Sequence, residues 1–397
     1  MSDQPTIEPL RFLPFRREDI LRSLYESLPL PPGESPQFER VLAQIEQHFR
    51  EDFASVRRDL KSLYAPLDPD RDTRVLPGEL PPEPPEELAN VLERVLDRAN
   101  YDKVSDDKLA KALKSSSLFQ VRLVVDLEDF EEVLLYTRGA SEREETLKEF
   151  FGLWKRRVRF VNYDRVVLFI RLKDEVDNEA TLGECPGGST LLKLFQNVPA
   201  SDLEMLFPNI RIGMRLLDKL MIGVPAVVSG FIVVSTKAGT TLLLLASLFG
   251  FWLGLSSEPV ELDKAAMLAV GASLFALGGY LWKQLSNYRN RKLKYTQALT
   301  QNLYFKLLDN NAGVIFRVLD DAEESEVKES FLAYYFLLLM EGEATAAALD
   351  DKIQAWFSQQ LGSTVDFDVE DALQKLAGLQ LAKAEGERWM LVPNPTI

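Results

Sequence analysis

The sequence predicts an α+β protein with a transmembrane helical hairpin, in which N-terminal helices accompany a small antiparallel sheet and the C-terminus forms a helical and winged-helix-like domain. Three observations support this fold class. Two uncharged runs of 18 residues stand close together in the second half of the chain. Segments typical of strands are grouped before these runs. Helical periodicity is found on both sides of them.

The composition is that of a globular protein with an acidic surface. With 397 residues, 46% of them hydrophobic, the chain is long enough for two or three domains with sizeable cores. The net charge of −15 repels phosphate backbones, so nucleic acid is not an expected partner. Cys185 is the only cysteine, which excludes an intrachain disulfide. The first residues resemble neither a signal peptide nor an organellar presequence, so any membrane attachment is expected to be internal.

The region before the uncharged runs is predicted to contain three parts. Residues 1–64 form an N-terminal helical region, and residues 65–87 form an extended, proline-rich connector. Residues 88–218 form an α+β domain, which begins with helices and continues with strands. The predicted strands start at Phe119, Glu132, Arg156 and Asp164. Two short helices at 184–210 are expected to follow, the second begun by a capping box at Ser201–Glu204.

Residues 238–282 are predicted to form the transmembrane hairpin. The uncharged runs are Ala238–Leu255 and Ala265–Trp282. As helices they would each be about 27 Å long, close to the roughly 30 Å hydrocarbon thickness of a bilayer. A buried hairpin is the alternative, and it would need a large domain around it. The apolar segment 219–237, which contains Pro225, is ambiguous, because it suits a pair of strands, an interfacial segment or a short third span.

Charged residues around the two runs predict how the hairpin is oriented. The loop between the runs is acidic, whereas a basic stretch without acids follows the second run. Positive-inside counting therefore predicts an integral membrane protein with both termini in the cytoplasm, in a bacterial cytoplasmic membrane or, alternatively, an organellar membrane. The same basic residues can also bind anionic lipid headgroups. They are Lys283, Arg289, Arg291, Lys292 and Lys294.

The chain after the hairpin is predicted to contain a helical region at 283–344 and a winged-helix-like domain at 345–397. The apolar run Phe331–Met340 is too short to cross a bilayer, so it should belong to a buried core helix that begins near Ala322. In the last domain, two helices should precede a hairpin that turns at Glu385-Gly386.

The winged-helix-like domain is expected to have a compact apolar core and an acidic surface. Its expected core residues are Phe367, Leu373, Leu376, Leu381 and Trp389. Lys375 is expected to be exposed, and its replacement to change stability by about half a kilocalorie per mole or less. Because Lys375 is the only basic residue of the second helix, a protein-contact role fits better than DNA binding.

No complete catalytic or metal-binding motif is present, and no cofactor is expected. His48 is the only histidine, which excludes a multi-histidine metal site, and it is interpreted as a surface residue. Cys185 has no histidine nearby in the sequence and is interpreted as a loop thiol. Six carboxylates at 320–329 can bind a cation, although an acidic first helical turn explains them more simply. They are Asp320, Asp321, Glu323, Glu324, Glu326 and Glu329.

Three stretches of the chain resemble a known family. They are TLLKLFQNVPASDLEMLFPNIRI from Thr190, the segment from YTQALTQ at Tyr295 to FLAYYFLL, and VDFDVEDALQKLAGLQL from Val365. They are similar to the transmembrane protein 143-like family, and the block from YRNRKLKY to AEESEVKES is the most specific part. The resemblance covers the chain from about residue 90 to the C-terminus. It implies a membrane protein with two spans, flanking soluble domains and no established activity.

Two functional hypotheses follow from the sequence. The first is a membrane-anchored adaptor or regulatory scaffold that binds proteins or lipid at one membrane face. The alternative is a membrane-associated hydrolase that uses carboxylates and a metal. Converging carboxylates in a concave, strongly acidic site would favour the hydrolase, whereas a flat apolar patch would favour the adaptor. Membrane lipid and proteins are the expected partners.

Overall fold

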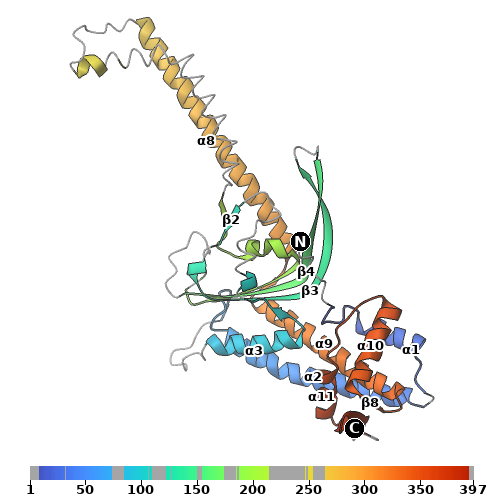
Figure 1. The fold of residues 1–397 in the computed structure, drawn as a ribbon. Helices are drawn as coiled ribbons and strands as arrows, with labels where there is room; N and C mark the ends of the chain where they lie inside the picture. The colour runs from blue at the N-terminus through green and yellow to red at the C-terminus, as the bar shows by residue number, and fades with distance from the viewer. Residues whose placement is uncertain are drawn as a thin grey trace, which may run out of the picture. The chain divides into compact units, whose positions relative to one another are not determined.

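The structure of the chain is a computed structural model. It describes residues 9–31, 33–73, 85–105, 107–109, 122–125, 127–149, 154–173, 185, 187–213, 246, 249–253 and 264–392. The chain divides into two compact units, which we describe separately (Figure 1). The core unit comprises Met1–Ser115, Asp126–Asn209 and Phe305–Ile397, and the second unit comprises Ser116–Val125 and Ile210–Tyr304.

Helix α9, Ala312–Leu339, is the central element of the core unit. Nineteen of its 28 residues are buried, so the helix is covered on nearly all sides. It packs against α2, α3, α10 and α11. The helices of the unit besides α9 are α1 Arg17–Ser27, α2 Ser35–Tyr64, α3 Pro85–Arg98, α10 Ala346–Leu361 and α11 Val369–Gly378. The buried core helix predicted around Phe331–Met340 is confirmed, although it begins ten residues earlier than expected.

An antiparallel sheet of five strands, in the order β1-β3-β4-β5-β7, is the second layer of the core unit. Its strands are β1 Asp102–Lys103, β3 Phe130–Glu149, β4 Trp154–Leu172, β5 Thr190–Pro199 and β7 Leu307–Asn310. One face of the sheet shares an apolar core with the helices, to which Tyr136, Val167 and Phe169 contribute. Outside this core, Phe130 at the start of β3 stacks on Phe207, with ring centroids 6.2 Å apart.

Two of the predicted strands form a single strand in the structure, and one predicted helix is a strand. The segments expected to start at Arg156 and Asp164 belong to one strand, β4. The first of the two helices predicted at 184–210 is wrong, because Thr190–Pro199 is strand β5. This strand lies between β4 and β7, and a strand buried on both faces has an apolar run that resembles a buried helix in sequence. The second is the 3-10 helix η3, Ala200–Leu206, which has no side-chain cap hydrogen bond.

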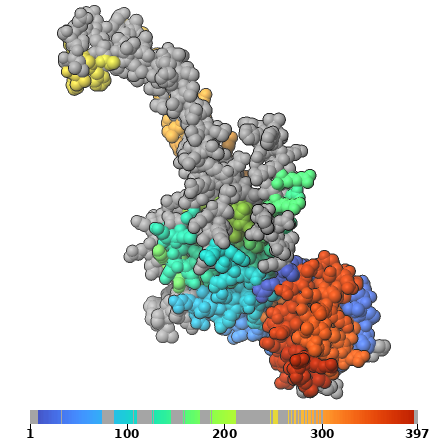
Figure 2. Space-filling model, in the orientation of Figure 1, coloured from blue at the N-terminus to red at the C-terminus, as the bar shows by residue number. Residues whose placement is uncertain are grey.

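The C-terminal part of the core unit, which we call the C-terminal module (343–391), contains the predicted helices and hairpin and is coloured orange to red in Figure 2. Strands β9 Ala382–Glu385 and β10 Arg388–Leu391 pair around Gly386, whose φ of 68° suits glycine. Strand β8, Glu343–Thr345, pairs with β10 and was not predicted. Four of the five expected core residues are buried, and Trp389 is partly buried.

The second unit contains helix α8, Lys264–Lys306, except for its last two residues, and a short ladder of β2 Arg122–Val124 with β6 Arg211–Gly213. Within the residues that the structure describes, no helix combines the length and the apolar character that crossing a bilayer requires. The prediction of a transmembrane hairpin at 238–282 is therefore wrong. The integral membrane location derived from it, in a bacterial or an organellar membrane, falls with it.

The hairpin prediction inferred a membrane environment from the length and the apolar character of the two uncharged runs. The run Ala265–Trp282 is apolar, but its length and lack of charge do not specify which surface covers it. In the structure this run is not a separate helix, because α8 continues through the basic stretch to Lys306. Most of the run Ala238–Leu255 and the whole ambiguous segment 219–237 lie outside the described residues.

Candidate functional site

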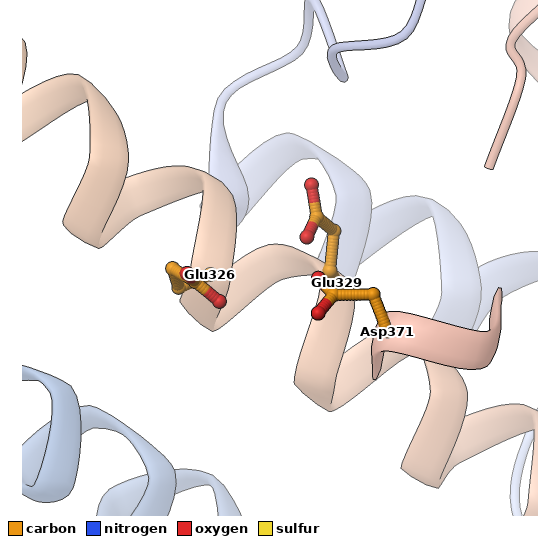
Figure 3. Close-up of side chains that lie close together, drawn as sticks. All are labelled: Glu326, Glu329 and Asp371. Atoms are coloured by element: carbon orange, nitrogen blue, oxygen red, sulfur yellow. The ribbon is translucent and has the colours of Figure 1, made fainter. Parts of the chain in front are cut away.

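Two glutamates on α9 define the candidate site. Glu326 and Glu329 are three positions apart, so they share one face of the helix, and both are buried. Helix α11 brings Asp371 close to them, as Figure 3 shows. Lys375 lies one helical turn after Asp371 and contacts the same carboxylates. We call these four residues, together with Arg98 and Asn100 at the end of α3, the buried charge cluster.

Lys375 provides the ammonium group to which all three carboxylates of the cluster bind. Its Nζ lies 3.1 Å from Glu329 Oε2, and it also forms ion pairs with Glu326 and Asp371. The side chain is only 17% exposed. The expectation that Lys375 is an exposed neighbour of the core is therefore wrong. Two of the acids that bury it, Glu326 and Glu329, come from α9, far away in sequence.

The end of α3 completes the cluster with two further donors. Arg98 Nε donates to Glu326 Oε1 at 2.6 Å, and Arg98 Nη2 donates to Asp52 Oδ2 at 2.8 Å. Asn100 Nδ2 donates to Glu329 Oε1 at 2.7 Å. The buried carboxylates are thus bound on both sides, and the cluster joins α2, α3, α9 and α11.

Burial and neighbouring charges have opposing effects on the pKa of Glu329 and also on the pKa of Lys375. Burial raises the pKa of Glu329 to about 7, and its contacts with Lys375 and Asn100 only partly offset this effect. For Lys375, burial by itself lowers the pKa, but Glu329, Glu326 and Asp371 together raise it above its usual range. Lys375 therefore stays charged, and Glu329 can take up a proton near neutral pH.

The three carboxylates have the geometry of a possible metal site. Within the described part of the chain, the carboxylate oxygens of Glu326, Glu329 and Asp371 lie within 4.8 Å of one another. A metal ion there would compete with the ammonium group of Lys375, which already contacts all three residues. The arrangement is that of a satisfied ion-pair network, in which a lysine takes the position of a cation.

The six acids predicted as a group at 320–329 do not form one site. Only Glu326 and Glu329 enter the cluster, whereas Asp321 binds Arg138 at 3.0 Å and Glu324 binds Lys328 at 3.2 Å. The explanation by an acidic first helical turn is also wrong. Helix α9 begins at Ala312, so these acids lie in its middle, where side-chain partners rather than the helix dipole stabilise them.

The predicted basic residues Lys283, Arg289, Arg291, Lys292 and Lys294 all lie on α8. Lys283, Arg289 and Lys294 are exposed, and the side chains of the other two lie outside the description. Arg289 borders a groove of about 580 Å³ on this helix. The residues that line the groove are Trp282, Leu285, Ser286, Arg289, Asn290, Leu293 and Thr296.

Sequence reasoning missed the contributions of Arg98, Asn100 and Lys375 to the buried charge cluster. The pattern offered a partial signal, because Glu326 and Glu329 face one side of α9 within a strongly apolar helix. His48 is exposed, as predicted. Cys185 is a free, partly exposed thiol, and burial raises its pKa.

Comparison with known proteins gives one family match. A family model described as "Protein of unknown function (DUF3754)" matches residues 163–313. The match includes the end of β4, β5 and all of α8, but not the part of β4 before Tyr163 or most of the C-terminal part. No solved structure matches the chain. The resemblance to the transmembrane protein 143-like family stays a prediction.

Proposed function

We propose that the protein is an adaptor or regulatory scaffold, and that it binds a protein partner through one face of α8. The observation that carries this proposal is a stripe of exposed apolar side chains along that helix. Leu268, Phe275 and Trp282 are spaced seven residues apart, so they lie on the same side of the helix. Phe275 is 86% exposed and Trp282 70% exposed. Exposed apolar surface of this kind is typical of an interaction site.

The groove at residues 282–296 has the composition of a protein interface. It combines two leucines and Trp282 with Arg289 and small polar side chains. Tryptophan and arginine are the residues most enriched in the energetic centres of protein interfaces, and hydrogen-bonding groups around them give specificity. A surface that only inserted into lipid would not need these polar groups inside the groove.

The charge near the groove indicates the chemistry of the partner. Residues 283–294 contain five basic side chains and no acid, in a chain of net charge −15. Such a local excess of positive charge attracts an acidic segment and speeds its association. The partner we propose is an acidic amphipathic protein segment, with its apolar side on Trp282 and its acids near Lys283 and Arg289.

The hydrolase alternative is less well supported. It needs carboxylates that are available to a metal, whereas Glu326, Glu329 and Asp371 are already bound to Lys375. Nucleic acid is a poor partner for a chain of this net charge, because phosphate contacts supply much of its binding energy.

Photocrosslinking tests the adaptor proposal on the full chain. A benzoylphenylalanine residue is introduced at Trp282 or Leu285 and, as a control, at the exposed position Arg58 on α2. We expect crosslinks at the two α8 positions to an acidic segment of one protein, and a synthetic copy of that segment should bind the purified chain. The charge reversal Lys283→Glu/Arg289→Glu should weaken that binding, whereas Arg57→Glu/Arg58→Glu should not. Crosslinks to lipid alone, or equal crosslinking from all three positions, would contradict the proposal.

A further inference from the structure

Strands β3 and β4 continue as a two-stranded ribbon beyond the rest of the sheet. They pair with each other from Phe130 and Leu172 to Glu149 and Trp154 (Figure 1). Strand β5 pairs with β4 only as far as Asn162, opposite Pro199. Strand β1 pairs with β3 only at Tyr136 and Thr137. We call residues 140–149 and 154–161 the β arm; no third strand of the described chain pairs with it.

Strand β5 ends at Pro199 because of the local sequence. Pro199 has no backbone N–H to continue the ladder, and the chain turns into η3 at Ala200. At this point Arg143 of the arm donates to Asn197 Oδ1 at 3.0 Å, which fixes the base of the arm to β5. The open edge of β4 therefore begins at a defined position.

An open strand edge presents backbone donors and acceptors to another chain. In an antiparallel pair, alternate residues direct their N–H and C=O groups away from the partner strand. On β4, such groups between 154 and 161 meet no strand in the described structure. Proteins usually protect such edges or use them to bind an extended peptide as an additional strand.

The charge of this edge strand is strongly biased. Residues 154–161, WKRRVRFV, contain four basic side chains and no acid. Arg157 is 80% exposed and Arg159 is 72% exposed. Both pair with one acid of β3, Glu144, at 3.5 Å and 3.7 Å, so a single carboxylate faces two guanidinium groups. Net positive charge therefore remains on the surface of the strand.

We propose that the open edge of β4, residues 154–161, binds an extended acidic segment of a partner protein as an additional antiparallel or parallel strand. Main-chain hydrogen bonds supply the binding mode, and Arg157 and Arg159 select acidic side chains. This surface is separate from the groove on α8, so the proposal does not rest on the adaptor function proposed above. Nucleic acid is the less favoured ligand, because the chain as a whole carries a charge of −15.

A peptide-binding experiment with the purified full chain tests this proposal. The probe is a fluorescent peptide of about eight residues that alternates glutamate and valine, a length matching the open edge. Two control peptides carry lysine in place of glutamate, or N-methyl groups on every second amide. We expect the acidic peptide to bind, and both controls to bind at least about tenfold more weakly, because one loses charge attraction and the other loses main-chain donors.

Two variants and a hydrogen-exchange measurement locate the binding. Arg157→Glu/Arg159→Glu should abolish binding, and the milder Arg157→Gln/Arg159→Gln should weaken it. Arg57→Glu/Arg58→Glu on α2 changes the net charge equally and should have no effect. Bound peptide should slow amide exchange at residues 154–161. The proposal is overturned if the acidic peptide does not bind at about 1 mM, if the N-methylated peptide binds equally well, or if only duplex DNA binds the arm.

Discussion

Helices α8 and α9 both contain long apolar runs, but the run of α9 is buried, whereas α8 exposes large apolar side chains. In α9 the run Phe331–Met340 is covered almost completely by α2, α3, α10 and α11. In α8, five large apolar side chains between Leu268 and Leu293 are more than half exposed. Even the charged residues Glu326 and Glu329 of α9 are more buried than Trp282 of α8.

The difference shows what an apolar run in a sequence implies. It indicates side chains that gain from leaving water, but not which surface covers them. In α9 the cover is supplied by helices of the same chain, and contacts with Arg98, Asn100 and Lys375 allow Glu326 and Glu329 to be buried. In α8 the exposed residues form the surface that we propose binds a partner. Substitutions matched between the core and α8 test this distinction.

The largest difference is expected between two leucine-to-aspartate substitutions. Leu376 is fully buried on α11, so Leu376→Asp would bury an unpaired charge and should abolish cooperative folding of the core unit. Leu285 on α8 is 53% exposed, and Leu285→Asp should change the free energy of unfolding by less than about 0.5 kcal/mol. Thermal unfolding followed by circular dichroism distinguishes the two. Comparable loss of structure in both variants would show that the α8 stripe is covered within this chain.

A second pair compares lysines. Lys375→Ala leaves the buried carboxylates of Glu326 and Glu329 without their ammonium partner, and should destabilise the core unit by about 3–5 kcal/mol. Lys283→Ala removes an exposed lysine on α8 and should change stability by about 0.5 kcal/mol or less. Urea titration of the full chain measures both. A small effect of Lys375→Ala would mean that the cluster contributes little to the core.

Two glycines provide the next comparison. Gly139, at the base of the β arm, has a φ of +69°, and an added Cβ would collide with Asp164 Oδ2 and lie 2.9 Å from Phe12 Cε1. Gly139→Ala should therefore destabilise the sheet by about 1–3 kcal/mol. Gly271 lies in α8 with nothing within 4 Å of an added Cβ, so Gly271→Ala should stabilise that helix by up to about 1 kcal/mol. Unfolding midpoints that move in the same direction would refute this prediction.

The smallest effect expected is a pH dependence from Glu329. Its pKa is raised from 4.5 to about 7 by burial, so the folded chain keeps a proton that the unfolded chain releases between these values. The contribution of Glu329 to stability therefore falls as pH rises through this window. Glu329→Gln should become more stable relative to the unmodified chain by roughly 2 kcal/mol between about pH 5 and about pH 7. Unfolding measured at both pH values, with exposed Glu26→Gln as control, checks this; a constant difference would argue against a shifted pKa.

The sequence by itself determined the elements whose signals are local. The buried helix around Phe331–Met340, the two helices of the C-terminal module and the hairpin at Glu385-Gly386 were all predicted. Their periodicity and turn residues depend on neighbours within a few positions. The strands that contain Glu132 and Asp164 were recognised for the same reason.

The tertiary structure alone decided the features that depend on distant partners. Thr190–Pro199 became a strand because β4 and β7 offer backbone partners on both sides, which no local pattern reveals. The buried charge cluster joins Arg98, Glu326 and Lys375 from three helices, and their burial is stable only because these charges meet. The transmembrane interpretation failed because it inferred the environment of an apolar run from the run itself. Whether such a run is covered by lipid, by a partner or by its own chain depends on surfaces that local sequence does not specify.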